Sequence, residues 1–269
     1  MLENELISKF NERIKTINLN AYGVLDENDR IHTLGTDSKL IGRIFEMFAQ
    51  PILEEIATEY GYIIETPEAQ TVYPDFVLMT DKKSKEKIAI DIKTTYVEKG
   101  DSTIKFTLGA FGSYMRNNTK NIAYPYTDFS KHFVIGFVYM RNGEAQESKV
   151  FELKDRTKIA CPYKNVRFFM QEKYKIAGDK PGSGNTENIG SFSTKDIDDL
   201  IKGKGPFSKL GPEIYDLYWK YYPKYRSPDK PYTNLAEFLK WLPLHINEVS
   251  LFRNFDKNKV IESIKNYSF

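Results

Sequence analysis

Apolar residues recur every three or four positions near the start of the chain and again beyond Gly190. This spacing is typical of amphipathic helices. It predicts helices over residues 2–17, 38–60, 195–202, 212–222, 234–242 and 256–266. Thr36 or Asp37 can cap the second of these helices. Pro51 is expected to bend or interrupt the same helix, and Gly61 to end it.

The middle of the chain instead carries short β-rich runs bounded by polar turns. Strands are expected over residues 71–79, 87–97, 133–140 and 166–171, the last leading on to 174–177. A further helix is expected near 109–118, and a β-hairpin over 20–34 with its turn at 26–29. Helices on either side of four or five strands predict an α/β fold with a central mixed β-sheet flanked by helices.

Composition narrows the class of protein. A length of 269 residues allows one large domain or two small ones, and we expect a single domain over residues 1–269. Hydrophobic residues make up 41% and charged residues 28%, which fits a soluble globular protein with a sizeable core. The longest mostly apolar run, 132–140, is far shorter than the roughly 18 residues that span a bilayer, so no membrane partner is expected.

The reactive side chains are few. Cys161 is the single cysteine, which excludes an internal disulfide and a multi-cysteine zinc site and favours a reducing cytoplasm. The acidic N-terminus has no apolar segment typical of a secretory signal. The three histidines, His32, His132 and His245, lie far apart, so a histidine-based metal site or catalytic triad is disfavoured.

The net charge of +2 does not by itself indicate a nucleic-acid partner. Residues 202–230, however, interleave lysines and one arginine with tyrosines and a tryptophan. Such a segment can bind a phosphate backbone. It can equally be an amphipathic helix with its rings in the core and its lysines in solvent, and the charge pattern leaves both readings open.

The most informative residues lie on the two strands joined by the turn around Lys83. If these strands form an antiparallel hairpin centred on Lys83, Asp75 lies directly opposite Asp91. Like charges at that range are destabilising unless a cation lies between them. Two carboxylates with open coordination positions suit Mg²⁺. Because side chains alternate along a strand, Lys93 shares the face of Asp91.

These residues match the needs of phosphodiester hydrolysis. A metal would polarise the phosphate and acidify water, and Lys93 could orient that water and stabilise negative charge. The alternative is a surface hairpin with solvated side chains. Against it, Asp91 and Lys93 interrupt the apolar run 88–92, where burial without function would be costly.

Two other features are weaker when taken alone. Glu46 lies beside the apolar stripe of the helix 38–60 and is a candidate third acid, although a solvated glutamate explains it as well. Residues 178–191 contain four glycines and two asparagines. Glycines permit close backbone approach to a ligand, and an asparagine can pair with adenine in the major groove, but a flexible surface turn has the same composition.

Longer stretches of the sequence resemble a known family. The matching stretches are 73–76, 88–96, 104–109, 116–122, 176–179 and 182–186. They resemble type II restriction endonucleases of the EcoRV type, in the PD-(D/E)xK nuclease superfamily, from about residue 1 to about 205 and again at 232–242. The resemblance implies a restriction-endonuclease-like core. It also implies a cytoplasmic homodimer that cuts double-stranded DNA at the centre of GATATC and leaves blunt ends.

By position in those motifs, the resemblance implies roles for individual residues. Asp75, Asp91, Lys93 and Glu46 resemble the catalytic residues, and the three acids among them the ligands of Mg²⁺, for which Mn²⁺ can substitute. The DNA-binding residues would be Gly182, Ser183, Gly184, Asn185, Thr186, Asn188, Gln70, Lys39, Thr95, Ser113, Lys120 and Arg141. The hairpin 20–34 resembles a dimerisation element, and a companion adenine methyltransferase is expected in the same system.

The sequence also departs from the family. Thr71 stands where the family has an asparagine, residues 220–230 do not align, and residues 243–269 resemble an added helical extension. Two other functions are weighed against restriction. One is a repair or nicking nuclease on the same core, and the other is a catalytically inactive DNA-binding module. An inactive module would be expected to have lost one of Asp75, Asp91 or Lys93, and all are present.

Overall fold

The computed structural model describes residues 3–69, 71–100, 103–182, 187–224 and 226–267. The chain divides into two compact units. Unit 1 comprises residues 1–61, 92–104 and 135–170, and unit 2 comprises residues 62–91, 105–134 and 171–269. The expectation of a single domain over residues 1–269 stays a prediction.

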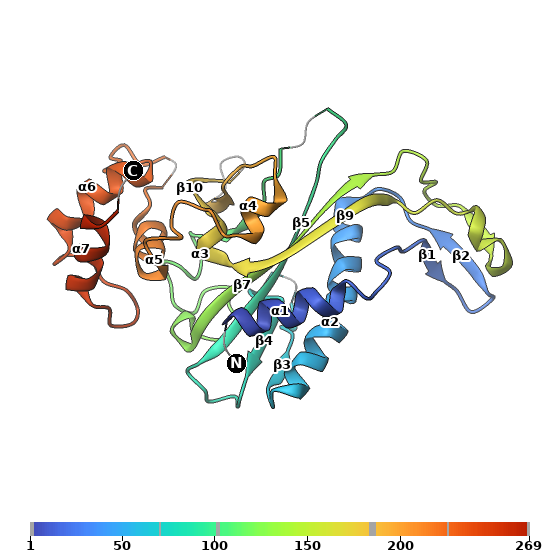
Figure 1. Ribbon diagram of the computed structural model, residues 1–269, viewed down its shortest axis with the longest axis horizontal. Coiled ribbons are helices and arrows are strands. Elements are labelled where there is room, and N and C mark those ends of the chain that lie inside the picture. Colours follow the sequence, from blue (N-terminus) through green and yellow to red (C-terminus); the bar gives the residue numbers. More distant parts are fainter. Residues whose placement is uncertain (1–2, 70, 101–102, 183–186, 225, 268–269) are drawn as a thin grey trace. The chain divides into compact units, whose positions relative to one another are not determined.

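A five-stranded mixed sheet has the strand order β3-β4-β5-β7-β9 (Figure 1). Its strands are β3 (Ile63–Glu65), β4 (Phe76–Met79), β5 (Lys87–Tyr96), β7 (Phe129–Arg141) and β9 (Tyr163–Glu172). The pairings of β3 with β4 and of β4 with β5 are antiparallel. This sheet and the helices that flank it confirm the predicted α/β fold.

Two helices of unit 1 form where the apolar spacing predicts them. They are α1 (Glu3–Ile14) and α2 (Ser38–Glu59). Asp37 caps α2, because its carboxylate accepts hydrogen bonds from the backbone N–H groups of Lys39 and Leu40 at 3.0 and 2.9 Å. Gly61, with a φ of 69°, follows the end of α2 as expected.

The expected interruption at Pro51 is wrong, because α2 runs through this residue without a break. Pro51 is exposed, and Met47, four residues earlier, has 63% of its surface exposed. The carbonyl that loses its hydrogen bond to the proline therefore lies on the solvent side of the helix, where water can replace the missing donor.

The hairpin expected over residues 20–34 is confirmed. Strands β1 (Gly23–Leu25) and β2 (Arg30–Thr33) pair antiparallel, and a strand missed in the sequence, β8 (Val150–Glu152), adds to β2. The carboxylate of Asp26 closes the turn by accepting hydrogen bonds from the backbone N–H groups of Asn28 and Arg30. A hydrogen bond to His32, the backbone bonds and the Arg30 side chain together hold the pKa of Asp26 well below its usual range.

Unit 2 contains a second small sheet that the sequence did not predict. It has the order β10-β11-β6 and consists of β6 (Thr107–Ala110), β10 (Ala177–Pro181) and β11 (Asn188–Ser191). The helix expected near 109–118 is therefore wrong. Gly109 has a φ of 99°, outside the helical region, and Ala110 pairs with Asn188. The expected strand at 174–177 is wrong in part, since the short helix α3 (Lys173–Ile176) precedes β10.

The predicted C-terminal helices are confirmed as α4 (Ile197–Ile201), α5 (Pro212–Tyr221), α6 (Leu235–His245) and α7 (Lys257–Lys265). The aromatic residues of the 202–230 segment lie in the core of unit 2, since Tyr215, Tyr218 and Trp219 are at most 3% exposed. The structure thus favours the amphipathic-helix interpretation of that segment. In the part of the chain described, no helix combines the length and the apolarity that crossing a membrane requires.

Candidate active site

The hairpin of β4 and β5 has the register expected from the sequence. Phe76 faces Ile90, and the neighbouring pairs follow in step toward the turn at Lys83. Continued outward by one position, this register sets Asp75 opposite Asp91. Side chains directly opposite on antiparallel strands have Cβ atoms about 4.5–5.5 Å apart. Asp75 directly precedes β4, so its place opposite Asp91 is an extension of the observed register.

The strand β5 carries polar side chains where its sequence is otherwise apolar. Asp91 is 3% exposed, between Ile90 at 0% and Ile92 at 6%. Lys93, half-buried and two positions further along β5, shares the strand face of Asp91, and its Nζ donates to the carbonyl of Ile92 at 3.3 Å. The strand therefore places a buried acid and a half-buried lysine on one face, and their catalytic roles stay predictions.

Tyr73 anchors the segment that leads to Asp75. Its ring stacks on that of Tyr114 with centroids 4.4 Å apart, and its hydroxyl shares a hydrogen bond of 2.8 Å with Nδ1 of His132. Burial raises the pKa of Tyr73 well above 10, and the charges of Asp91 and Asp75 raise it further. Both carboxylates therefore act on the Tyr73 hydroxyl, which agrees with their position on the hairpin.

The donor chemistry of this pair fits a hard divalent cation. Carboxylate oxygens are the ligands that Mg²⁺ takes in proteins, and a cation would remove the repulsion between Asp75 and Asp91. Within residues 3–267, leaving aside those the structure does not describe, no three His, Cys, Asp or Glu side chains form a group that could hold a metal. The fit therefore rests on the two facing acids.

Glu46, the predicted third acid, lies on α2 in unit 1. Its neighbour Phe45 is fully buried and stacks on Phe137 of β7 with ring centroids 4.5 Å apart, which fixes this turn of the helix. The Glu46 carboxylate accepts a hydrogen bond of 2.5 Å from Arg43. Its assignment as a catalytic residue and metal ligand stays a prediction.

Three of the predicted DNA contacts belong to unit 1. Lys39 is exposed in the first turn of α2, and Thr95 is half-buried on β5. Arg141, at the end of β7, is exposed and has its guanidinium 3.7 Å from the centroid of the Tyr96 ring. Exposed cations of this kind are suited to phosphate contact, which stays a prediction for each of them.

Two further predicted contacts lie in the loop that follows β6 in unit 2. Ser113 is 5% exposed, and its hydroxyl donates to the carbonyl of Lys120 at 2.7 Å. The ammonium of Lys120 is exposed and lies 3.4 Å from the carbonyl of Gly112. The buried Ser113 therefore stabilises the loop through this hydrogen bond, whereas the charged group of Lys120 is exposed to solvent.

The glycine-rich segment forms a hairpin of β10 and β11. The backbone N–H of Gly182 donates to the carbonyl of Asn188 at 2.7 Å, and β11 pairs with β6. Glu187 fixes the base of the hairpin, since its carbonyl accepts from the N–H of Phe111 at 2.7 Å. The other predicted DNA-reading residues, Ser183, Gly184, Asn185, Thr186 and Gln70, lie outside the described residues.

Two lysines of unit 2 are buried, which the sequence did not predict. Lys87 is fully buried and donates to the carbonyls of Lys82 and Ser84, which ties the turn to the start of β5. Lys173 is 2% exposed and donates to the hydroxyl of Tyr114 at 2.7 Å. No local pattern distinguishes these lysines from exposed ones, since both buried positions depend on non-local packing.

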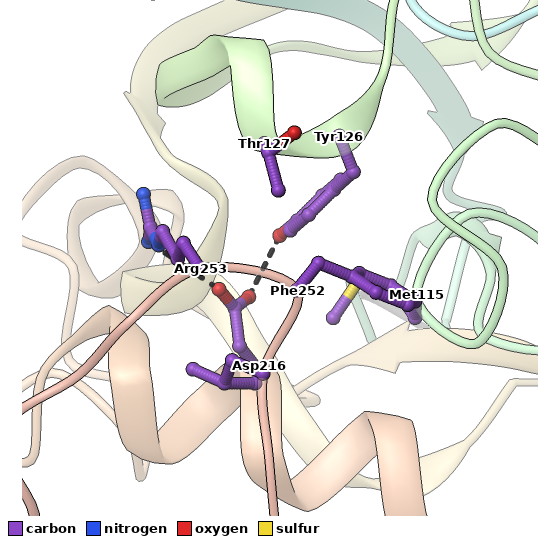
Figure 2. A pocket seen from close by; sticks show the side chains of 7 residues that line it. Met115, Tyr126, Thr127, Asp216, Phe252 and Arg253 are labelled. Atoms are coloured by element: carbon purple, nitrogen blue, oxygen red, sulfur yellow. Dashed lines mark hydrogen bonds and ion pairs between the residues drawn. The ribbon is translucent and has the colours of Figure 1, made fainter.

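A third buried charge, Asp216 on α5, was also missed. It lines a small pocket, where it accepts a hydrogen bond of 2.7 Å from the hydroxyl of Tyr126 and pairs with Arg253 at 3.5 Å (Figure 2). Burial raises the pKa of Asp216 to about 6, although the Arg253 charge acts in the opposite direction. Met115, Thr127, Leu251 and Phe252 complete the lining of the pocket.

Comparison with known proteins finds similarity to restriction endonucleases. The family model described as restriction endonuclease EcoRV matches residues 15–243. The type II restriction enzyme EcoRV of Escherichia coli is 43% identical over 222 residues, which cover 82% of this chain and 89% of that protein. Among solved structures, the NlaIV restriction endonuclease aligns over 98% of this chain and 96% of its own at 10% identity, with a TM-score of 0.40.

The TM-score of 0.40 is too low to support an argument about fold or function. The family model and the alignment with 43% identity each cover most of the chain and therefore identify the family. The helix α7 lies beyond the residues that the family model matches. The chain belongs to the EcoRV family of restriction endonucleases.

Proposed function

We propose that this restriction endonuclease hydrolyses phosphodiester bonds of double-stranded DNA with Mg²⁺ as cofactor, at the sequence GATATC and with a blunt central cut. The observation that supports the proposal is the register of β4 and β5, which, extended by one position, pairs Asp75 with the buried Asp91, two residues before Lys93. The base sequence and the blunt cut rest on the likeness to EcoRV alone.

The residues divide the chemistry between them. The bound Mg²⁺ supplies positive charge to the scissile phosphate and lowers the pKa of water. Asp75 and Asp91 would hold the cation, and Glu46 stays the third acid that the sequence resemblance implies. Lys93 orients the attacking water and stabilises the negative charge that develops on phosphorus. The water oxygen would form a bond to phosphorus and release a proton to solvent, while the bond from phosphorus to one sugar oxygen breaks and that oxygen takes up a proton.

A homodimer is proposed because a palindrome presents the same half-site twice. The small sheet of unit 1 supports a dimer contact, since Val24 and Leu25 on β1 are 61% and 54% exposed and Val150 on β8 is 51% exposed. Exposed apolar side chains grouped on one sheet are typical of a surface that a partner covers. The hairpin 20–34 is therefore the proposed dimerisation element.

Base reading is assigned to the segment between β10 and β11, with Asn185 as its principal candidate. An asparagine side chain can form two hydrogen bonds to adenine in the major groove. A restriction enzyme of this specificity requires a companion adenine methyltransferase, which protects the GATATC sites in the DNA of the same cell. This methyltransferase is part of the proposal, as is a cytoplasmic location.

Digestion of a sequenced plasmid with Mg²⁺, followed by mapping of the ends, tests the proposed function. We expect blunt ends at each GATATC and an uncut plasmid in EDTA. Cuts at another sequence would overturn the specificity, and nicks in one strand would favour the repair-type alternative. Binding without cleavage under all metal conditions would leave the catalytically inactive module as the better description.

A further inference from the structure

The ammonium group of Lys173 lies in the interior of unit 2. Burying a charge there costs free energy unless the charge is paired or hydrogen-bonded. Lys173 is 2% exposed. It donates a hydrogen bond of 2.7 Å to the hydroxyl of Tyr114, and its Nζ lies 4.3 Å from the centroid of the Tyr73 ring. A cation over an aromatic face is attracted by the electrons of the ring, most strongly where water is excluded.

Tyr73 connects Lys173 with the carboxylate pair. Tyr73 lies two residues before Asp75. Its ring stacks on the ring of Tyr114 and also contacts the ammonium of Lys173. The hydroxyl end of Tyr73 is fixed by His132. A change at Lys173 therefore acts on the direction in which the chain enters β4, and so on the position of Asp75.

The same lysine also touches the sheet that carries the DNA-reading hairpin. A Cβ built on Gly109 of β6 would lie 2.7 Å from the Tyr114 hydroxyl and 3.5 Å from Nζ of Lys173. The β6 backbone therefore packs directly against the Lys173–Tyr114 pair. One side of this pair therefore packs on β6, the strand next to β11 of the reading hairpin, and the other side contacts Tyr73, in the segment that leads to Asp75.

We propose that Lys173 is a positioning residue for DNA cleavage. It acts through Tyr73 and Tyr114 to hold Asp75 in a fixed position relative to the β10–β11 hairpin, which carries the proposed DNA-reading residues. The inference rests on the proposed function. Lys173 does not touch the phosphate in this proposal. It fixes the two tyrosines, and they transmit a shift of the reading hairpin to the carboxylate pair.

The test is single-turnover cleavage with enzyme in excess at saturating Mg²⁺, on a duplex with the sequence that the parent enzyme cuts and on one-base variants of it. Lys173→Met keeps the length of the side chain and removes its charge. We expect its rate constant on the cognate duplex to fall roughly 10–100-fold, as for residues that support metal ligands. The ratio of cognate to variant cleavage should fall as well.

Two variants separate positioning from folding. Lys173→Arg keeps the charge and the donor and should recover most of the rate. Tyr114→Phe removes only the hydroxyl that accepts from Lys173 and should give a smaller loss, so it also serves if Lys173→Met does not fold. A merely structural role would lower the amplitude, which counts folded enzyme, and would leave the rate constant and the cognate ratio unchanged.

The matched control is Lys175→Met, on the same short helix. Lys175 pairs with Glu172 at 2.8 Å, and its variant should cleave both duplexes at the parental rate. Parental rates and ratios in Lys173→Met and Tyr114→Phe would overturn the inference while the proposed function stands. A parent enzyme that cuts no DNA with Mg²⁺ would overturn the proposed function and the inference with it.

Discussion

Two regions of unit 2 bury a carboxylate to nearly the same extent, and they do so in opposite electrostatic surroundings. Asp91 on β5 is 3% exposed and Asp216 on α5 is 4% exposed. The register of the hairpin sets a second carboxylate, that of Asp75, across from Asp91. Asp216 instead faces the guanidinium of Arg253 and the hydroxyl of Tyr126 (Figure 2).

The comparison teaches that burial alone does not identify a catalytic acid. A buried acid that faces a fixed cation has its charge compensated in part by the protein itself, as Asp216 has by Arg253. A buried acid that faces another acid is compensated best by a cation that can bind from solution. The group across from the acid, rather than its exposure, therefore distinguishes a metal ligand from a structural ion pair.

The largest expected effect comes from the carboxylate pair. Asp91→Asn and Lys93→Ala should each abolish plasmid cleavage at saturating Mg²⁺ and leave a folded dimer, since Asp91→Asn also removes a like-charge repulsion. Asp216→Asn, the same chemical change at equal burial, should keep the parental rate constant. Near-parental cleavage by either of the first two variants would remove that residue from the mechanism.

The second expected effect is on the pH dependence of stability. Asp216 has a folded-state pKa of about 6, above its usual 3.8, so the folded protein binds its proton more tightly than the unfolded chain. The stability that this proton contributes is present below pH 4 and is lost as pH rises toward about 6. Over that window the parent should lose about 3 kcal/mol relative to Asp216→Asn.

Denaturant unfolding of the parent and of Asp216→Asn at several pH values between 4 and 7 measures this difference. The Asn variant cannot titrate at this position, so the two stability curves should diverge as pH rises and run parallel above the pKa. Parallel curves over the whole range would mean that Asp216 ionises in the folded protein as it does in water.

A smaller effect is expected on metal-free binding. Asp75→Asn removes one negative charge near the proposed scissile phosphate, so it should bind a GATATC duplex about tenfold more tightly than the parent in EDTA. Ca²⁺ should tighten binding by the parent without supporting cleavage, because it is larger and accepts looser geometry than Mg²⁺. Gel-shift titrations measure both, and equal affinities throughout would argue against a metal at the carboxylate pair.

The smallest expected effect concerns the structural ion pair. Arg253 is partly exposed, so Arg253→Met should cost only about 1 kcal/mol of unfolding free energy at pH 7. At about pH 4, where Asp216 is protonated in the folded protein, most of that cost should disappear. A loss that is equally large at both pH values would show that Arg253 stabilises by packing rather than by its charge.

Short-range signals carried most of the prediction from sequence. The cap at Asp37, the end of α2 near Gly61 and the turn around Lys83 follow from residue types within a few positions. Because two antiparallel strands joined by a short turn have one register, the turn alone was enough to set Asp75 against Asp91. The register of this hairpin was therefore predictable from the sequence, and the roles of its two acids stay predictions.

Prediction from local sequence pattern was wrong where a strand could pair with a segment far away in the sequence. The spacing of apolar residues near 109–118 favours a helix, but the strand β11, some 80 residues away, offers a pairing edge, and Gly109 takes a backbone angle that a helix forbids. At Pro51 the local pattern predicted a break that does not form. The helix α2 is exposed to solvent there, so water can replace the backbone hydrogen bond that the proline removes.

The sequence by itself determined most of the helices and the register of the central hairpin, because each depends on spacing within one segment. Only the tertiary structure decided which charges are buried and what faces them. Lys173 and Asp216 have no local signature, since their partners Tyr73, Tyr114, Tyr126 and Arg253 come from distant segments. The free energy of a buried charge depends on the groups around it, and those groups meet only when the chain has folded.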